Sequence, residues 1–421
     1  MTKLYDIEEQ KEQFILIGVA VSDNDDTREA LEELGELVET AGGTTVGMVI
    51  QNRERIHSST YIGKGKMEEV RQLILETGAT GVICDDELSP AQLKNLEDTL
   101  QTVVLDRTIL ILDIFAKRAT TKEGKLQVEM AQLKYRSTRL VGMGNVLSRL
   151  GGGIGTRGPG EKKLEADRRH IRDRLSQLKR ELEGLEKNRE TARSLRSRSN
   201  IPVVAIVGYT NAGKSTLINH LTHAGVLEED KLFATLDPTT RSYTMESGQQ
   251  VLFTDTVGFI RKLPHHLINA FRSTLEEAKY SDMILHVVDS INPYAYKQMH
   301  IVYDTLASLG IRDKTIITVF NKQDKLIGER EEFVTEQTLK DFKADYTVKI
   351  SAKTGAGVDK LLELIEQVLM EQKILIEEIF SYNEAGKIQT IRKYGNLIEE
   401  DYRENGIYVK AYIPKNIFKG I

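Results

Sequence analysis

The strongest constraint on the fold is the motif Gly-Tyr-Thr-Asn-Ala-Gly-Lys-Ser at Gly208–Ser215, which directly follows the apolar run 203–207. It matches the pattern G-x-x-x-x-G-K-[ST], whose glycines let backbone N–H groups close around phosphate groups. Such a loop lies between a buried strand and the start of a helix. The sequence therefore predicts a phosphate-binding loop in which Lys214 reaches the β- and γ-phosphates and the Ser215 hydroxyl ligates Mg²⁺.

Further apolar runs alternate with polar, helix-like stretches on both sides of this loop. Before it they lie at 14–21, 45–50, 81–84 and 103–105, and after it at 251–253, 283–288, 315–320 and 348–350. This order predicts an α/β fold with a doubly wound sheet, which binds its ligands at the carboxyl ends of the strands.

A second motif, Asp255-Thr-Val-Gly258, ends one of these runs. At a strand end downstream of a phosphate loop, Asp255 is expected to hold a water molecule bound to Mg²⁺. The Gly258 amide is expected to contact the γ-phosphate.

The identity of the base is predicted by Asn321-Lys-Gln-Asp324, which follows the run 315–320. The Asp324 carboxylate can accept from both the ring N–H and the exocyclic amine of guanine, whereas adenine has no matching pair of donors. Leaving a charged group unpaired is costly, so guanine is selected. Ser351-Ala-Lys353 is expected to complete the base pocket through the Ala352 amide. The four motifs together predict a GTP-binding, GTP-hydrolysing switch protein.

The loop Phe233-Ala-Thr-Leu-Asp-Pro-Thr-Thr-Arg241 lies where a first switch is expected. One threonine hydroxyl there should complete the Mg²⁺ shell when the γ-phosphate is present. Thr235 is favoured, with Thr239 and Thr240 as alternatives. The predicted catalytic residues are Lys214, Thr235 and Gly258, and the predicted metal ligands are Ser215, Thr235 and, through water, Asp255. The predicted nucleotide contacts are Gly208, Tyr209, Thr210, Asn211, Ala212, Gly213, Lys214, Ser215, Thr216, Phe233, Ala234, Thr235, Leu236, Asp237, Asp255, Thr256, Val257, Gly258, Asn321, Lys322, Asp324, Ser351, Ala352 and Lys353.

Phe259 stands where signalling GTPases place the glutamine that orients the attacking water. Because a phenyl ring cannot do this, GTP hydrolysis should be slow until a partner orders the switches or supplies a group. Arg261, His265 and His266 are nearby candidates for such a group.

Residues 116–200 contain 22 lysines and arginines against 10 acidic residues, although the whole chain has a net charge of −5. This excess suits either a polyanion such as RNA or a well-solvated helical face. Leucine and isoleucine recur at coiled-coil spacing between Leu164 and Leu185, and a looser pattern runs from Leu126 to Leu147. The glycine-rich stretch 151–160 separates the two. We expect an antiparallel helical hairpin, with a homodimeric coiled coil as the alternative.

The tip of this hairpin is either a functional contact or a mere hinge. Its position between two basic helices favours a tip that follows a phosphate backbone or enters an RNA cleft. The candidate RNA-binding residues are Arg149, Arg157, Lys162, Lys163, Arg168 and Arg169.

A chain of 421 residues exceeds one hydrophobic core. We expect an α/β N-terminal domain at 1–115, the hairpin at 116–199, a GTPase domain at 200–372 and a small α+β domain at 373–421. The small domain should contain a strand, a helix and two further strands, in that order. The stretch Gly63-Lys-Gly-Lys66 is either an ordinary strand-to-helix turn or a phosphate site. No apolar run is long enough to span a membrane, the acidic start lacks a secretory signal, and Cys84 is the single cysteine, so a cytoplasmic location is expected.

With these motifs the chain resembles the HflX family of ribosome-associated GTPases over essentially its whole length. The resemblance is carried by Gly208–Ser215, Phe233–Asp237, Asp255–Arg261, the tip 151–160 and Arg168–Arg174. It implies Mg²⁺-dependent GTP hydrolysis to GDP, binding to the large ribosomal subunit and ribosomal RNA, and stimulation by ribosomes. In some members it implies splitting or rescue of stalled ribosomes under stress, and a second site for ATP near Gly63–Lys66. The family commonly has an apolar residue at the position of Phe259. A monomer is expected.

Two other interpretations of the same residues stay open. One is a GTPase coupled to RNA modification, ribosome assembly or membrane events. The other is a scaffold that binds GTP passively and oligomerises through the helices of 116–200.

Overall fold

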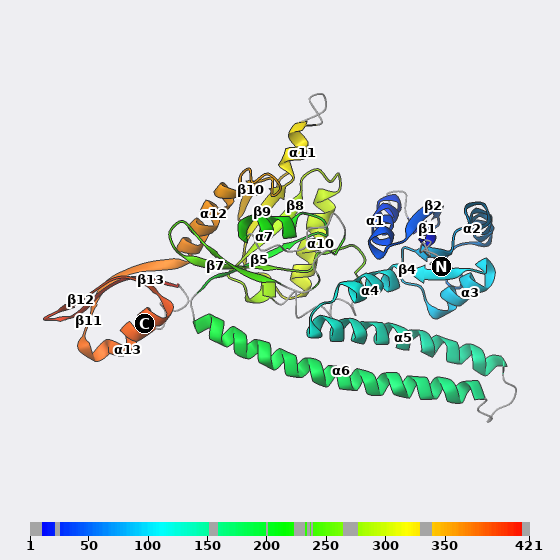
Figure 1. Ribbon diagram of the computed structural model, residues 1–421, viewed down its shortest axis with the longest axis horizontal. Helices are drawn as coiled ribbons and strands as arrows, with labels where there is room; N and C mark the ends of the chain where they lie inside the picture. The colour runs from blue at the N-terminus through cyan, green and yellow to red at the C-terminus, as the bar shows by residue number, and fades with distance from the viewer. Residues whose placement is uncertain are drawn as a thin grey trace, which may run out of the picture. The chain divides into compact units, whose positions relative to one another are not determined.

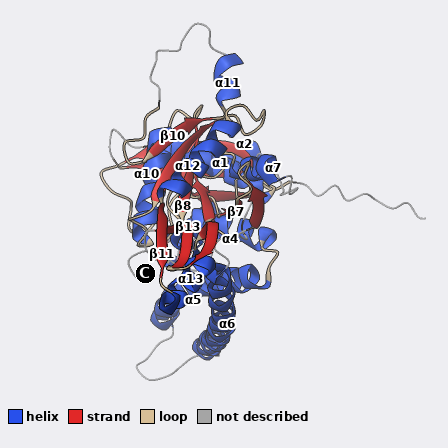
Figure 2. Ribbon diagram, turned by 90° about the vertical axis from the view of Figure 1, so that its left-hand side faces the viewer, coloured by secondary structure: helices blue, strands red, loops and turns tan. Residues whose placement is uncertain are grey.

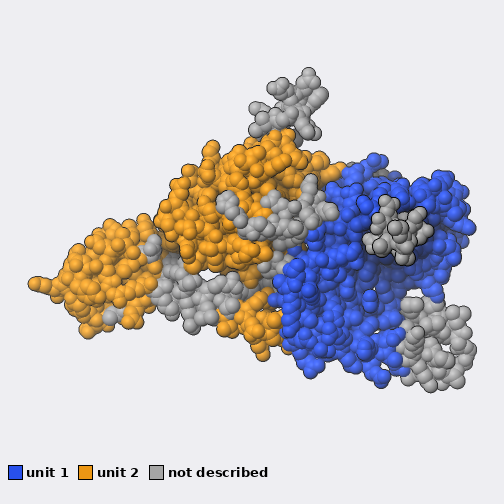
Figure 3. All heavy atoms as spheres, in the orientation of Figure 1, with its two compact units in different colours: residues 1–182, 229–237, 260–272 blue, residues 183–228, 238–259, 273–421 orange. Residues whose placement is uncertain are grey.

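The computed structural model divides into two compact units (Figure 3). Unit 1 comprises Met1–Leu182, Glu229–Asp237 and Ile260–Arg272, and unit 2 comprises Glu183–Glu228, Pro238–Phe259 and Ser273–Ile421. The structure describes residues 11–21, 26–150, 159–198, 201–222, 232–233, 236, 239–263, 277–328 and 339–414.

Unit 1 contains a four-stranded sheet in the order β2-β1-β3-β4, in which all neighbours are parallel. Figure 1 labels its strands β1, β2 and β4, in blue to cyan. The predicted α/β fold of this part is confirmed. Its strands are β1 (Gln13–Ala20), β2 (Thr44–Asn52), β3 (Gly81–Cys84) and β4 (Val103–Asp106), and its helices are α1 (Thr27–Ala41), α2 (Lys64–Thr77), α3 (Pro90–Leu100) and α4 (Arg107–Arg118).

Asp106 ties the helical arm to this sheet. Its side chain caps α4 by accepting from the Ile109 N–H at 3.0 Å. It also accepts from the Tyr135 hydroxyl at 2.7 Å and from the Arg139 guanidinium at 2.5 Å, both on α5 (Lys122–Leu150). Because this carboxylate is fully buried, its several donors are what make its burial tolerable.

The arm is an antiparallel hairpin of α5 and α6 (Pro159–Arg198), as predicted. Arg174 on α6 makes two hydrogen bonds to Glu129 on α5, at 2.7 and 2.8 Å, and Arg168 donates to the Leu140 carbonyl at 2.9 Å. Figure 2 shows the two helices side by side. The predicted tip ended at residue 160, but α6 already begins at Pro159, because proline is well tolerated in the first turn of a helix. Residues 151–158 lie outside the described residues.

Unit 2 contains a six-stranded sheet in the order β10-β9-β8-β5-β7-β6. Every pair is parallel except β6 with β7. The run 240–241, predicted as loop, starts strand β6. The strands of this sheet are β5 (Val203–Gly208), β6 (Thr240–Thr244), β7 (Gln250–Asp255), β8 (Met283–Asp289), β9 (Thr315–Asn321) and β10 (Tyr346–Lys349). The helices around it are α7 (Lys214–Thr222), α10 (Ala295–Ser308), α11 (Gln323–Gly328) and α12 (Val358–Glu371).

The C-terminal part of unit 2 has the predicted order of one strand, a helix and two further strands. The elements are β11 (Lys373–Phe380), α13 (Ala385–Tyr394), β12 (Asn396–Arg403) and β13 (Gly406–Pro414), and the antiparallel sheet has the order β11-β13-β12. Ile388 and Ile391 of α13 share a core with buried side chains of β11 and β13. The predicted fold class is therefore confirmed. Within the described part of the chain, no helix combines the length and apolar character that crossing a membrane requires.

Candidate nucleotide-binding site

The phosphate-binding loop follows β5, a central strand of the unit 2 sheet. Gly213 has φ +94°, and a Cβ there would lie 2.2 Å from the Asn321 amide nitrogen. A Cβ on Gly208 would lie 2.3 Å from the Val287 carbonyl oxygen. Both glycines are therefore required by close approach of neighbouring groups as well as by their backbone conformation.

Lys214 is the first residue of α7, and its side chain is buried. Its ammonium donates to the carbonyls of Tyr209 at 2.7 Å and Gly208 at 3.2 Å. Burial lowers the pKa of Lys214 to about 8, while the Asp255 carboxylate acts in the opposite direction. The loop thus surrounds the Lys214 ammonium, and phosphate oxygens would stabilise its charged form.

Affinity for GTP should depend on pH through this lysine. In the free protein its pKa is about 8, and bound phosphates raise that pKa, so binding takes up a proton above pH 8. We predict an affinity that levels off about one pH unit or more below pH 8, and a loss approaching about tenfold per pH unit above it. Calorimetry in buffers of different ionisation enthalpy would measure the proton uptake. Binding that stays pH-independent to pH 10 would contradict this prediction.

The oxygen atoms of Ser215 and Asp255 lie together at the carboxyl edge of the sheet. Ser215 Oγ is 3.3 Å from Asp255 Oδ2, and the Asp255 side chain is buried. Hydroxyl and carboxylate oxygens are the ligands that Mg²⁺ prefers, so these residues fit the ion. Among the alternative threonines, Thr240 pairs its hydroxyl with that of Thr254 at 3.0 Å, which commits it to the sheet.

The Asp255–Gly258 motif runs from β7 toward the phosphate-binding loop. The Phe259 N–H donates to the Gly208 carbonyl at 3.1 Å, and the Thr210 N–H donates to the Phe259 carbonyl at 2.8 Å. A Cβ on Gly258 would lie 3.1 Å from Lys214 Nζ. Gly258 therefore lies against the lysine that should contact the γ-phosphate, and the Phe259 ring is buried, with 2% of its surface exposed.

Asn321 joins two of the predicted motifs. Its amide nitrogen donates to the Ala212 carbonyl at 2.9 Å, and its amide oxygen accepts from the Ala352 N–H at 2.8 Å. The Ala352 amide, predicted to contact the base, thus bonds Asn321 here, and contacting guanine requires it to exchange that partner. Ser351 donates to the Asp324 carboxylate at 2.6 Å and orients it.

Asp289 is a residue of this site that the motifs did not reveal. It ends β8, and its carboxylate pairs with Lys322 at 2.8 Å, where Lys322 has φ +65°. Its position at the end of a predicted strand could have revealed it, because the carboxyl ends of neighbouring parallel strands meet at one edge of the sheet.

The predicted residues of the first switch and of the helical arm are only partly among the residues that the structure describes. Phe233 and Leu236 are buried within unit 1, where the Phe233 ring packs edge-on against Phe115 of α4 with ring centroids 4.7 Å apart. Ala234, Thr235 and Asp237 lie outside the described residues, as do His265 and His266. Of the RNA-binding candidates, Arg169 is exposed and Arg168 is half-buried against α5. Arg157 and the side chains of Arg149, Lys162 and Lys163 are outside the described part.

Comparison with protein families assigns these segments consistently. Residues 28–116 match the model of a GTP-binding GTPase N-terminal domain, 118–196 that of the GTP-binding GTPase middle region, and 203–322 that of a 50S ribosome-binding GTPase. The chain is 60% identical to the GTPase HflX of Lacrimispora saccharolytica, over all of this chain and 98% of that protein. The chain belongs to the HflX family.

Other HflX proteins match nearly as completely. The GTPase HflX of Caldanaerobacter subterraneus is 51% identical over 97% of this chain and 92% of its own length. That of Escherichia coli is 41% identical over 87% of this chain and 85% of its own. A crystal structure of SsGBP in complex with GDP has 26% identity and a TM-score of 0.47, over 85% of this chain and 98% of that one. As an HflX family member with a phosphate-loop GTPase domain, the chain is a GTP hydrolase.

Proposed function

We propose that the protein is a Mg²⁺-dependent GTPase that binds the large ribosomal subunit and hydrolyses GTP faster on the ribosome. The proposal that the protein binds GTP rests on one observation: Lys214, the Ser215–Asp255 pair and Asp324 lie at the same edge of the unit 2 sheet. The family model of a 50S ribosome-binding GTPase over residues 203–322 supports the choice of partner.

The proposed roles follow from the chemistry of each side chain. Lys214 binds the β- and γ-phosphates, Gly258 donates its amide to the γ-phosphate, and Asp324 accepts from guanine. Ser215 and, through water, Asp255 hold Mg²⁺, which neutralises charge on the phosphates, and we propose Thr235 as its switch ligand. Because Phe259 is buried and apolar, orientation of the attacking water must come from the ordered switches or from the partner.

The helical arm is the proposed RNA-binding part. Exposed Arg169, Arg172 and Arg180 lie along α6, and positively charged side chains of this kind contact phosphates. We propose that the arm enters a ribosomal RNA cleft in the GTP state and leaves after hydrolysis, and that the protein acts as a cytoplasmic monomer that splits or rescues stalled ribosomes under stress.

A second site for ATP in unit 1 receives less support. The Gly63 N–H at the start of α2 donates to the Gln51 side chain at 2.8 Å, and Lys66 pairs with Glu69 at 2.7 Å. These local partners favour the interpretation of 63–66 as an ordinary turn.

The proposal is tested by measuring GTP turnover with and without purified large subunits, beside cosedimentation and mass by light scattering. We expect stimulation by the subunits, binding that depends on the GTP state, and a monomeric mass. A stable dimer with unstimulated turnover would instead support the scaffold interpretation.

Replacing Arg157, Lys162 and Lys163 together by Gln should weaken ribosome binding by on the order of tenfold to a hundredfold at low salt. Three lost phosphate contacts should also reduce the slope of log affinity against log salt by about two units. Basal hydrolysis should be unchanged. Replacing Lys117 at the end of α4 together with Lys122 and Lys125 at the start of α5, all away from the tip, is the matched control. Equal losses from the two sets would exclude a specific role of the tip.

A further inference from the structure

The segment that follows Phe259 belongs to the compact unit that contains the N-terminal sheet. Residues Ile260–Arg272 group with unit 1, although the chain on either side of them, Pro238–Phe259 and Ser273–Ile421, groups with unit 2. Of this segment the structure describes residues 260–263, among which Ile260 is buried. The motif expected to contact the γ-phosphate is therefore continued by residues whose partners lie in the N-terminal unit.

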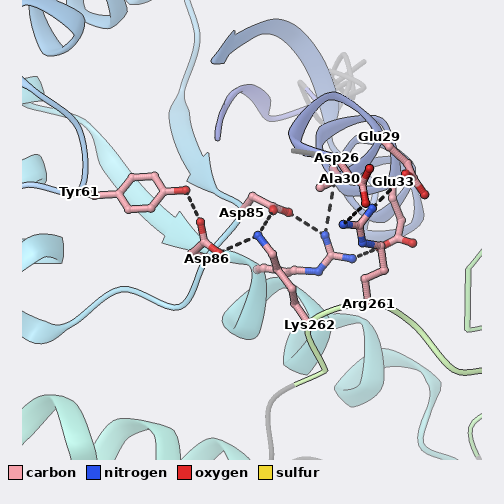
Figure 4. A network of polar contacts seen from close by, with 10 residues as sticks. Asp26, Glu29, Ala30, Glu33, Tyr61, Asp85, Asp86, Arg261 and Lys262 are labelled. Atoms are coloured by element: carbon pink, nitrogen blue, oxygen red, sulfur yellow. Dashed lines mark hydrogen bonds and ion pairs between the residues drawn. The ribbon is translucent and has the colours of Figure 1, made fainter. Parts of the chain in front are cut away.

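Lys262 is held by two carboxylates at the carboxyl end of β3. Its ammonium lies 2.5 Å from Asp85 Oδ2 and 2.6 Å from Asp86 Oδ1 (Figure 4). The side chain is 40% exposed, whereas that of Asp85 is 1% exposed. Burial works against the charge on Lys262, but the two carboxylates outweigh it and raise its pKa. Lys262 also adopts φ +50°, a conformation that L-residues seldom populate.

Arg261 is held by a second pair of acidic groups, at the start of α1. Its guanidinium lies 3.2 Å from Glu29 and 3.7 Å from Asp26. Figure 4 shows both basic side chains directed into acidic groups that come from different elements of unit 1. Two consecutive residues are thus held by different elements: Arg261 by acids at the start of α1, and Lys262 by acids at the end of β3. We call Asp26, Glu29, Asp85 and Asp86 the acidic clamp.

The acids that hold Lys262 have other partners that fix their positions. Asp85 accepts from the buried Arg107 at 2.7 Å, and Arg107 also pairs with Glu33. Asp86 accepts from the Tyr61 hydroxyl at 2.7 Å. Because these contacts do not involve Lys262, they hold Asp85 and Asp86 in place independently of it, so this half of the clamp is preorganised.

The other end of the segment is fixed to the phosphate-binding loop. Phe259 makes two backbone hydrogen bonds to that loop, and Gly258 lies against Thr210 and Lys214. Only Ile260 and Arg261 separate Phe259 from Lys262, so the chain has few backbone torsions in which a displacement of Lys262 can be absorbed before it reaches Phe259. Gly258 therefore lies four positions before the residue whose ammonium the two carboxylates hold.

We propose that the acidic clamp positions Gly258 for the γ-phosphate by holding Arg261 and Lys262, which makes these basic residues and the acids positioning residues for GTP hydrolysis. This inference rests on the proposed contact between Gly258 and the γ-phosphate. GDP has no γ-phosphate, so its binding does not use that contact. Loosening the clamp consequently weakens binding of a GTP analogue and leaves binding of GDP unchanged.

The test compares dissociation constants for a non-hydrolysable GTP analogue and for GDP in the full chain. Lys262→Gln should weaken analogue binding by about tenfold, within the usual range for coupling between two sites, and change GDP binding by less than about twofold. Lys262→Arg should retain most of the analogue affinity. Lys117→Gln removes another exposed lysine of unit 1, which pairs with Asp113 at 3.0 Å, and serves as the control.

Exchanging the charges of Lys262 and Asp86 distinguishes a positioning role of this ion pair from a general loss of structure. Lys262→Glu alone should lower analogue affinity by more than Lys262→Gln, because it places like charges together. Adding Asp86→Lys should recover much of that affinity. Unchanged analogue-to-GDP ratios in Lys262→Gln, or no recovery in the exchanged pair, would overturn the clamp. If the unaltered protein bound neither the GTP analogue nor GDP, the proposed nucleotide site itself would be wrong.

Discussion

Asp324→Asn should convert the protein from a guanine-binding to a xanthine-binding one. The carboxylate accepts from two guanine donors, and replacing it by an amide places an N–H₂ group against the guanine amine. Losing the bond to the amine, facing two donors with each other and removing the charge from the remaining bond should weaken GTP binding by roughly a hundredfold to ten-thousandfold. Xanthosine triphosphate presents an acceptor where guanine has its amine, so its affinity should rise by a comparable factor. Competition between the two nucleotides for a fluorescent analogue would measure both.

Asp313→Asn is a suitable control for this exchange, because it changes the same charge at an exposed position of unit 2. Ser351 already donates to Asp324, and it can donate equally to the asparagine oxygen, so the side chain should keep its orientation. If Asp324→Asn retained full preference for guanine, the assignment of this carboxylate to base recognition would be wrong.

Lys214→Ala should abolish tight binding of GTP and GDP. The lysine is buried in the phosphate loop, with both its carbonyl partners belonging to that loop. Its removal deletes charge-assisted bonds to two phosphates, worth about 1.5–3 kcal/mol each, which corresponds to at least about a hundredfold in affinity. Equilibrium dialysis with labelled nucleotide would measure the loss.

The exposed Lys325→Ala in the same unit should bind normally and controls for a lost positive charge. Thermal unfolding without nucleotide would show whether Lys214→Ala is folded. A folded variant that still bound GTP tightly would exclude Lys214 from phosphate recognition.

Most strands could be predicted because buried parallel strands are continuous apolar runs. β3, with the sequence Gly-Val-Ile-Cys, is buried at every residue, and its neighbours were recognised in the same way. β6 was missed because Thr-Arg-Ser-Tyr-Thr has neither an apolar run nor clear alternation. Its place on the sheet edge is set by antiparallel pairing with β7. Such pairing depends on a partner strand rather than on local sequence.

The nucleotide residues could be proposed because each motif combines a strand end with a chemically specific side chain. The acidic clamp could not, because Lys262 and Asp85 are 177 positions apart in the sequence. Each looks like an ordinary surface charge until the fold brings them together. The bond between Asn321 and the Ala352 amide was missed for a related reason, since each residue was assigned to the ligand and not to the other.

The central claim is that guanosine triphosphate with Mg²⁺ binds at the strand ends that carry Lys214, Ser215, Asp255 and Asp324. Isothermal titration of the purified full chain with non-hydrolysable analogues of GTP and ATP, each with Mg²⁺ and with chelator, tests it most directly. The account predicts one tight site for the GTP analogue, weaker binding in chelator, and binding of the ATP analogue at least about a hundredfold weaker. Equal or tighter binding of the ATP analogue, with no heat from the GTP analogue, would contradict it.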